Sequence, residues 1–88
     1  MTHAFYSDAA EKIRAELTRS ERAAVETVRA SLESDPQQGR SLPNADSASQ
    51  SFVVELLPEV TGGRGLSVVY RYSEDLDAVL ILWLIAGP

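Results

Sequence analysis

Two arginines in the second half of the chain, Arg64 and Arg71, are the residues best suited to chemistry on a phosphate. A guanidinium stabilises the negative charge that develops on a phosphoryl group during reaction. Arg64 follows a Gly-Gly turn, and Arg71 lies in a segment rich in valine and tyrosine. We therefore treat both as candidate catalytic residues. The favoured interpretation is still that both are ordinary surface residues, with Arg71 paired to Glu55 or Glu74.

Other chemistries have few residues to support them. The chain has no cysteine and one histidine, His3, which excludes disulfides and thiolate zinc sites and disfavours a histidine-based triad. Tyr70 and Tyr72 flank Arg71, so in a strand they point to the opposite face, toward the core. We expect no cofactor and no metal.

The charge balance argues against a protein that binds nucleic acid by itself. Thirteen acidic residues outweigh eight basic ones, and the net charge is −5. Autonomous DNA or RNA binding needs an excess or a stripe of basic side chains, and we do not expect it here. The N-terminus lacks the pattern of a secretory signal, and the apolar run at 78–86 is much shorter than the ~20 residues of a membrane helix. The expected location is the cytoplasm, with no membrane contact.

The first half of the chain predicts a short strand followed by two helices. Residues 3–7 form the brief strand. Asp8 with Glu11, and Thr18 with Glu21, have the spacing of helix-starting capping boxes, and Ser20 is an alternative cap for the second helix. The second helix is expected to end at Asp35, because the residue before a proline is pushed out of helical conformations. Its buried stripe is then formed by Ala24, Val25, Val28, Ser31 and Leu32.

The second half predicts a polar loop at 36–50 and strands at 51–57, 66–73 and 78–86. The last of these strands is apolar on both faces, and the two helices can cover only one face of a sheet. The other face is covered either by the loop or by a partner. Alternation places Leu80, Leu82 and Leu84 on one side of this strand. On the other side are the candidate partner-binding residues, Val79, Ile81, Trp83 and Ile85.

This order of elements resembles that of the RelE/ParE toxin superfamily. The resemblance is carried by the helix end at 32–36, the Gly-Gly turn, and the Val-Val-Tyr-Arg segment at 68–71. It covers nearly the whole chain, taken as one domain at 1–88. It implies an α+β fold in which a short N-terminal strand and two antiparallel helices accompany a mainly antiparallel, twisted sheet of three to four strands. It also implies an antitoxin peptide that wraps the domain.

The resemblance further implies basic residues that this chain does not carry. Members that cleave messenger RNA stabilise the scissile phosphate with basic side chains, and an arginine usually precedes the Val-Val-Tyr of the third strand. That position is Ser67 here, and Val53 and Glu55 stand where lysines or arginines are common on the second strand. Basic or aromatic residues after the last strand are also typical, whereas this sequence stops at Pro88. Cleavage by the familiar route is therefore not expected.

Three functions remain open at this stage. The leading one is a divergent toxin that acts through protein contacts, with a gyrase-type target favoured over messenger RNA. The second is a non-toxic protein-binding or dimerisation module. The third is a metal-independent, ribosome-dependent endoribonuclease that uses Arg64 and Arg71. The expected partners are an antitoxin peptide or a second copy of the chain, and a target protein or the ribosome.

Overall fold

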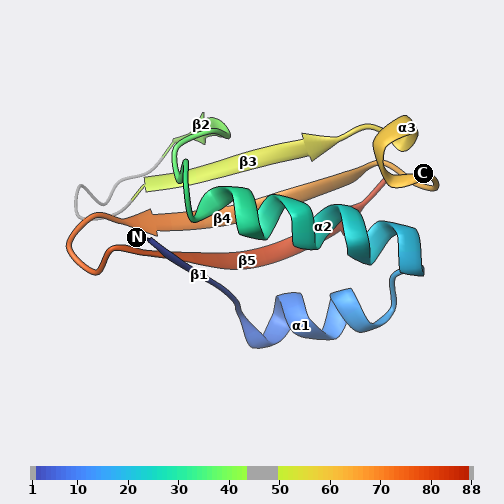
Figure 1. The fold of residues 1–88 in the computed structure, drawn as a ribbon, viewed down its shortest axis with the longest axis horizontal. Helices are drawn as coiled ribbons and strands as arrows, with labels where there is room; N and C mark the ends of the chain where they lie inside the picture. Colours follow the sequence, from blue (N-terminus) through green and yellow to red (C-terminus); the bar gives the residue numbers. More distant parts are fainter. Residues whose placement is uncertain (1, 44–49, 88) are drawn as a thin grey trace.

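Two helices lie across one face of a mixed sheet whose strand order is β1-β5-β4-β3-β2 (Figure 1). The computed structural model describes residues 2–43 and 50–87. Within those ranges the elements are β1 (His3–Tyr6), α1 (Asp8–Ala15), α2 (Arg19–Leu32), β2 (Arg40–Leu42), β3 (Gln50–Leu56), α3 (Pro58–Thr61), β4 (Leu66–Ser73) and β5 (Ala78–Ala86). The predicted α+β class is confirmed, with five strands in this sheet instead of three to four.

Both long helices begin at side-chain caps. The Thr18 hydroxyl accepts from the Glu21 backbone N–H, and the Glu21 carboxylate accepts from the Thr18 backbone N–H, so the predicted capping box is present. At α1 the cap is Ser7, whose hydroxyl accepts from the Ala10 N–H. Asp8 was expected to cap this helix, but it lies in the first turn, where its negative charge favours the helix dipole.

The core lies between α2 and the inner face of the sheet. Val25, Val28 and Leu32 are buried, and Ala24 and Ser31 of the predicted stripe are partly buried. Full burial of a valine or leucine side chain contributes about 1.5–3 kcal/mol, so this stripe fixes the helix on the sheet. The helix ends at Leu32, slightly before the predicted stop at the Asp-Pro pair.

The region predicted as a loop at 36–50 contains the short edge strand β2. Arg40 is in register with Val53, and the strand pairs antiparallel to β3. Gly39 permits this approach, because a Cβ there would lie 2.8 Å from the Val53 carbonyl oxygen. The Gly39 N–H also donates to the Tyr70 hydroxyl at 3.1 Å. β2 therefore extends the sheet instead of lying over its second face. Residues 44–49 of the predicted loop lie outside the described residues.

A bulge in β5 changes which side chains face the helices. Ile81 and Trp83 lie opposite consecutive residues of β4, so Leu82 between them has no register partner. Such an extra residue reverses the in-and-out alternation. Val79 and Ile81 are fully buried, whereas Trp83 and Ile85 are exposed. The prediction that these four share one face is wrong, because the strand is not regular.

Candidate functional site

The sheet face turned away from α1 and α2, here called the open face, carries a group of exposed apolar side chains. Phe5 on β1 lies opposite Leu80 on β5, and Trp83 lies opposite Val69 on β4. Phe5, Trp83 and Ile85 are 56%, 52% and 55% exposed, and Leu80 is 41% exposed. Single exposed apolar residues are common on soluble proteins, but a contiguous group of them indicates a binding surface.

The three positions at which the sequence resemblance implies basic residues also meet on the open face. Glu55 lies directly opposite Ser67, and Val53 is two residues before Glu55 on the same face of β3. Val53 is buried. The Glu55 carboxylate accepts from Arg40 at 2.8 Å. The open face therefore presents a carboxylate, a hydroxyl and a covered valine at these positions, and this set cannot stabilise a phosphate.

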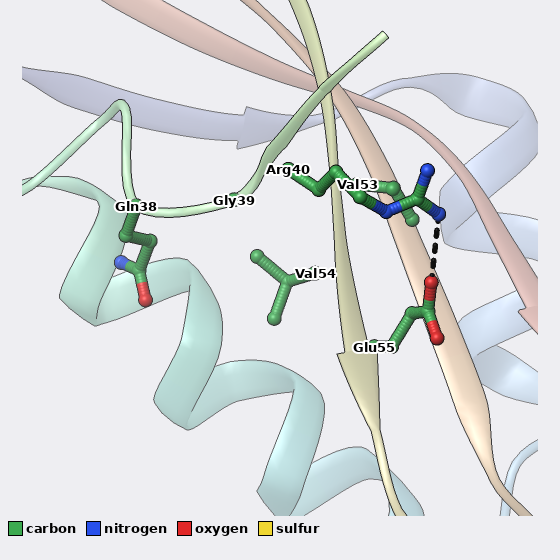
Figure 2. Close-up of a pocket in the computed structure, with 6 residues that line it drawn as sticks. All are labelled: Gln38, Gly39, Arg40, Val53, Val54 and Glu55. Carbon is green, nitrogen blue, oxygen red and sulfur yellow. Dashed lines mark hydrogen bonds and ion pairs between the residues drawn. The ribbon is translucent and has the colours of Figure 1, made fainter.

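A shallow depression of about 380 Å³ lies where β2 meets β3 (Figure 2). The ion pair between Arg40 and Glu55 crosses one side of it. β2 is paired with β3 only as far as Val53, so within the described residues the rest of that β3 edge has no strand neighbour. The charged side chains of the depression neutralise each other, which leaves it without a reactive group. Its lining is formed by Gln38, Gly39, Arg40, Val53, Val54 and Glu55.

Arg64, the first candidate catalytic residue, is held by Glu21 on α2. The Glu21 side chain is 1% exposed and accepts from the Arg64 backbone N–H and from its Nε, both at 3.2 Å. It also accepts from the Thr18 N–H at 2.9 Å. The Arg64 guanidinium, followed by the Thr18 N–H, lowers the pKa of Glu21 to about 2. Arg64 therefore fastens the turn before β4 to the start of α2.

Arg71, the second candidate, is exposed on the open face. It lies opposite Ser51 on β3 and Leu80 on β5. Glu55 is paired with Arg40 instead of Arg71, and Arg71 has no ion pair within residues 2–43 and 50–87. The seven residues from Arg64 to Arg71 span roughly 23 Å of extended chain. The structure therefore does not bring the two arginines together into one site.

The remaining titratable candidates are in ordinary positions. Tyr70 is fully buried, stacks on Phe52, and has its pKa raised by burial. His3 is exposed at the edge of the open face, with its ring 6.2 Å from that of Phe5. The described residues hold no group of three or more side chains suited to a metal ion. None of the described helices is both long enough and apolar enough to cross a membrane.

Sequence reasoning missed two members of the apolar group on the open face, Phe5 and Leu80. Phe5 joins the group only because β1 pairs in parallel with β5, its neighbour from the other end of the chain. No local signal in the sequence indicates that pairing. Leu80 was assigned to the face opposite Trp83, and the bulge at Leu82 places both on the same face.

Comparison with known proteins shows similarity in structure only. No protein-family model matches the chain, and no curated protein matches it by sequence. The structure of the intact RelBE toxin–antitoxin complex of E. coli matches with a TM-score of 0.77 at 11% identity, covering 100% of this chain and 99% of that chain. The RelBE2 toxin–antitoxin complex of Mycobacterium tuberculosis matches with a TM-score of 0.72 at 18% identity, covering 98% of both chains.

Two further solved structures agree with these. The archaeal RelE–RelB complex of Pyrococcus horikoshii has a TM-score of 0.72 at 14% identity, covering 97% of this chain and 93% of that chain. The isolated RelE toxin of E. coli has a TM-score of 0.73 at 11% identity, covering 100% of this chain and 86% of that chain. Identities this low establish the fold and leave the activity open. The chain has the fold of the RelE toxins.

Proposed function

We propose that this chain is a divergent toxin of a toxin–antitoxin pair that acts through protein contacts made by its open face. The observation that carries this proposal is the composition of that face. Trp83 and Ile85 are exposed beside Glu55 and Ser67, where a ribonuclease of this kind would carry cations. A carboxylate repels phosphate, whereas aromatic side chains dominate the binding energy of protein interfaces.

The first proposed partner is an antitoxin. Solved structures with the same fold include complexes of RelE with RelB, which supports an antitoxin for this chain as well. The net charge of −5 favours an antitoxin segment that places basic residues beside apolar ones.

The proposed target is a cytoplasmic protein, with a gyrase-type target favoured over messenger RNA. Inhibition of a protein requires a binding surface and no catalytic group, and the open face supplies such a surface. A ribosome-dependent endoribonuclease is disfavoured, because Arg64 is bound to Glu21 and lies far along the chain from Arg71.

A non-toxic binding module on the same scaffold is the second candidate. It is favoured by the same feature, since an apolar surface on which the described residues form no catalytic group needs no toxic activity to explain it. The two candidates differ in one measurable property, the effect of the protein on bacterial growth.

The deciding experiment is controlled induction of the protein in a bacterial host, with growth followed and messenger RNA 5′ ends mapped in the same cultures. We expect growth arrest without new cleavage sites. We expect arrest to disappear when Trp83→Ser and Ile85→Ser are combined, because these changes remove the apolar centre of the open face. The matched control is Val60→Ser, which alters an equally exposed apolar residue on α3.

Each other outcome removes part of the proposal. Arrest with new 5′ ends that vanish in Arg71→Ala would establish RNA cleavage and overturn the protein-contact mechanism. No arrest at a confirmed level of folded protein would overturn the toxin assignment and leave the non-toxic module. Equal loss of arrest in Val60→Ser would show that the open face is not the active surface.

A further inference from the structure

The open face has a feature that goes beyond the proposed function and does not depend on toxicity. Its pattern of apolar and polar side chains is complementary to itself under a two-fold rotation. We infer that the open face binds a second copy of this chain in a two-fold symmetric dimer centred on Trp83, with the facing strands antiparallel. The inference rests on strand register, exposure and charge in the described residues.

Three cross-strand rows on β5 and β4 define the pattern. The middle row is apolar, and each of the outer rows has an apolar residue on β5 and a polar residue on β4. From one end of the face to the other, the rows are Leu80 with Arg71, Trp83 with Val69, and Ile85 with Ser67. The apolar members on β5 are all substantially exposed, so this column is open to a partner.

A symmetric dimer uses the same patch on both copies, so the patch must be complementary to itself. Consider a two-fold axis in the plane of the interface that runs across the strands through the Trp83 row. Each strand then lies over its own counterpart, running in the opposite direction. Leu80 meets Ile85 of the second copy, and Trp83 meets Trp83. Arg71 meets Ser67 of the second copy, beside Glu55 in the same row.

An axis parallel to the strands and through β4 gives a poor match. It places Arg71 over Arg71 and Ile85 over Glu55 of the second copy. Such an interface would bring like charges together and would bury a carboxylate against an apolar side chain. The antiparallel arrangement avoids both costs. It also agrees with the aligned packing that is common between two sheets.

Charge supports a second copy as the occupant. Arg71 has no ion pair within the described residues, so its guanidinium is available to a partner. The carboxylate of Glu55 in the neighbouring row is 60% exposed even with Arg40 beside it. A central tryptophan surrounded by aliphatic side chains is also the composition typical of interface hot spots.

The first test is sedimentation equilibrium of the purified full chain over a range of concentrations. We expect a reversible dimer. Trp83→Ser should raise the dimer dissociation constant roughly 30-fold or more, since it removes the central hot spot from both copies. Val60→Ser should leave the dissociation constant unchanged. Circular dichroism of each variant checks that the fold is retained.

The second test uses charge to detect which positions face each other. Ser67→Arg alone places an arginine opposite Arg71 of the second copy, and Arg71→Glu alone places a carboxylate beside Glu55. Each change should weaken the dimer. The two changes combined in one chain should restore it, because opposite charges then meet across the interface at two places. Within one chain positions 67 and 71 are roughly 13 Å apart along β4, so the restoration requires two copies.

The matched control for Arg71→Glu is Arg22→Glu, an equal charge change on the exposed side of α2. A protein that stays monomeric at every concentration would overturn the inference. A dimer that Trp83→Ser does not weaken would also overturn it, because the interface would then lie elsewhere. If the single changes weaken the dimer and the combination does not restore it, the antiparallel arrangement is wrong. These results stand apart from the growth assay, so failure of one proposal does not imply failure of the other.

Discussion

Glu21 is a nearly buried carboxylate that joins two parts of the chain far apart in sequence. It accepts hydrogen bonds from Thr18, which starts α2, and from Arg64, which precedes β4. Sequence reasoning identified the contact with Thr18 from the capping-box spacing, and the structure adds the contact with Arg64. Arg64 was selected as a catalytic candidate for its charge and its position in a turn. Its side chain instead has a structural partner in Glu21.

This geometry predicts a pH-dependent stability difference between the wild type and Glu21→Gln. The pKa of Glu21 is lowered from 4.5 to about 2 in the folded protein. A group whose pKa is lower in the folded state stabilises that state above its unfolded pKa, and the contribution is lost as the pH falls from 4.5 toward 2. We expect Glu21→Gln to lower the free energy of unfolding clearly at neutral pH, and the difference should shrink across this window.

Urea unfolding of both proteins at several pH values measures the effect. Glu16→Gln, a change at an exposed glutamate just after α1, is the matched control and should cause little change. A difference between wild type and Glu21→Gln that stays constant down to the lowest pH would contradict the role given to the carboxylate.

Among the elements, those with strong local signals were predictable. The caps, the proline after α2 and the Gly-Gly turn placed both long helices and the strands β3, β4 and β5 close to their observed ranges. β2 and α3 were missed, since each is only three or four residues long. β2 depends on the long-range contact of Gly39 with Tyr70, which no local pattern reveals.

The candidate binding face was predictable only in part, for a physical reason. β5 is apolar at nearly every position, so alternation of side-chain polarity does not reveal which residues point inward. Trp83 and Ile85 are exposed as expected, whereas Val79 and Ile81 are in the core. The bulge at Leu82 causes this difference, and it follows from pairing with β4, which the β5 sequence alone does not encode.

The bulge predicts an unusual tolerance to deletion. Removal of Leu82 should give a regular strand. Each remaining β5 side chain should point to the same side of the sheet as in the wild type. The expected cost is about 1 kcal/mol from the hydrogen bond between the Ser7 hydroxyl and the Leu82 carbonyl, plus the partial burial of the leucine side chain. At concentrations at which the protein is monomeric, Trp83 should remain accessible to a fluorescence quencher in this variant.

Deletion of Leu80 is the matched control. This deletion moves the residues between the β4–β5 turn and position 80 to the opposite face, so Val79 should become exposed. The free energy of unfolding should fall by about 1.5–3 kcal/mol more than on removal of Leu82. Thermal unfolding of the two deletion variants measures the difference. Equal destabilisation by the two deletions would contradict the bulge as the cause of the reversed alternation.

In the molecule as a whole, the fold does not determine the chemistry of the surface. The chain shares the RelE fold with proteins at 11–18% identity, yet its charge is −5 and its open face carries a group of exposed apolar side chains. Fold is maintained by the core pattern, which many sequences satisfy, whereas activity depends on a few surface side chains. The fold was therefore a safer prediction than the function.

The net charge of −5 predicts that the isolated protein does not bind nucleic acid. Fluorescence anisotropy with labelled duplex DNA and single-stranded RNA should show no binding up to about 100 µM protein at ~0.15 M salt. A variant that combines Glu55→Lys with Ser67→Arg should gain measurable, salt-sensitive binding, since it adds a cation pair to the open face. Salt-sensitive binding of the wild type at low micromolar concentration would contradict this prediction.

The position of β5 in the sheet has a consequence for how the protein folds during translation. β5 lies between β1 and β4, although it is the last of these strands to be synthesised (Figure 1). Until it emerges, β1 has no neighbour in the sheet and the apolar sides of α1 and α2 lack the centre of the surface they pack against. The core is therefore complete only after β5 has been synthesised and has paired with both β1 and β4.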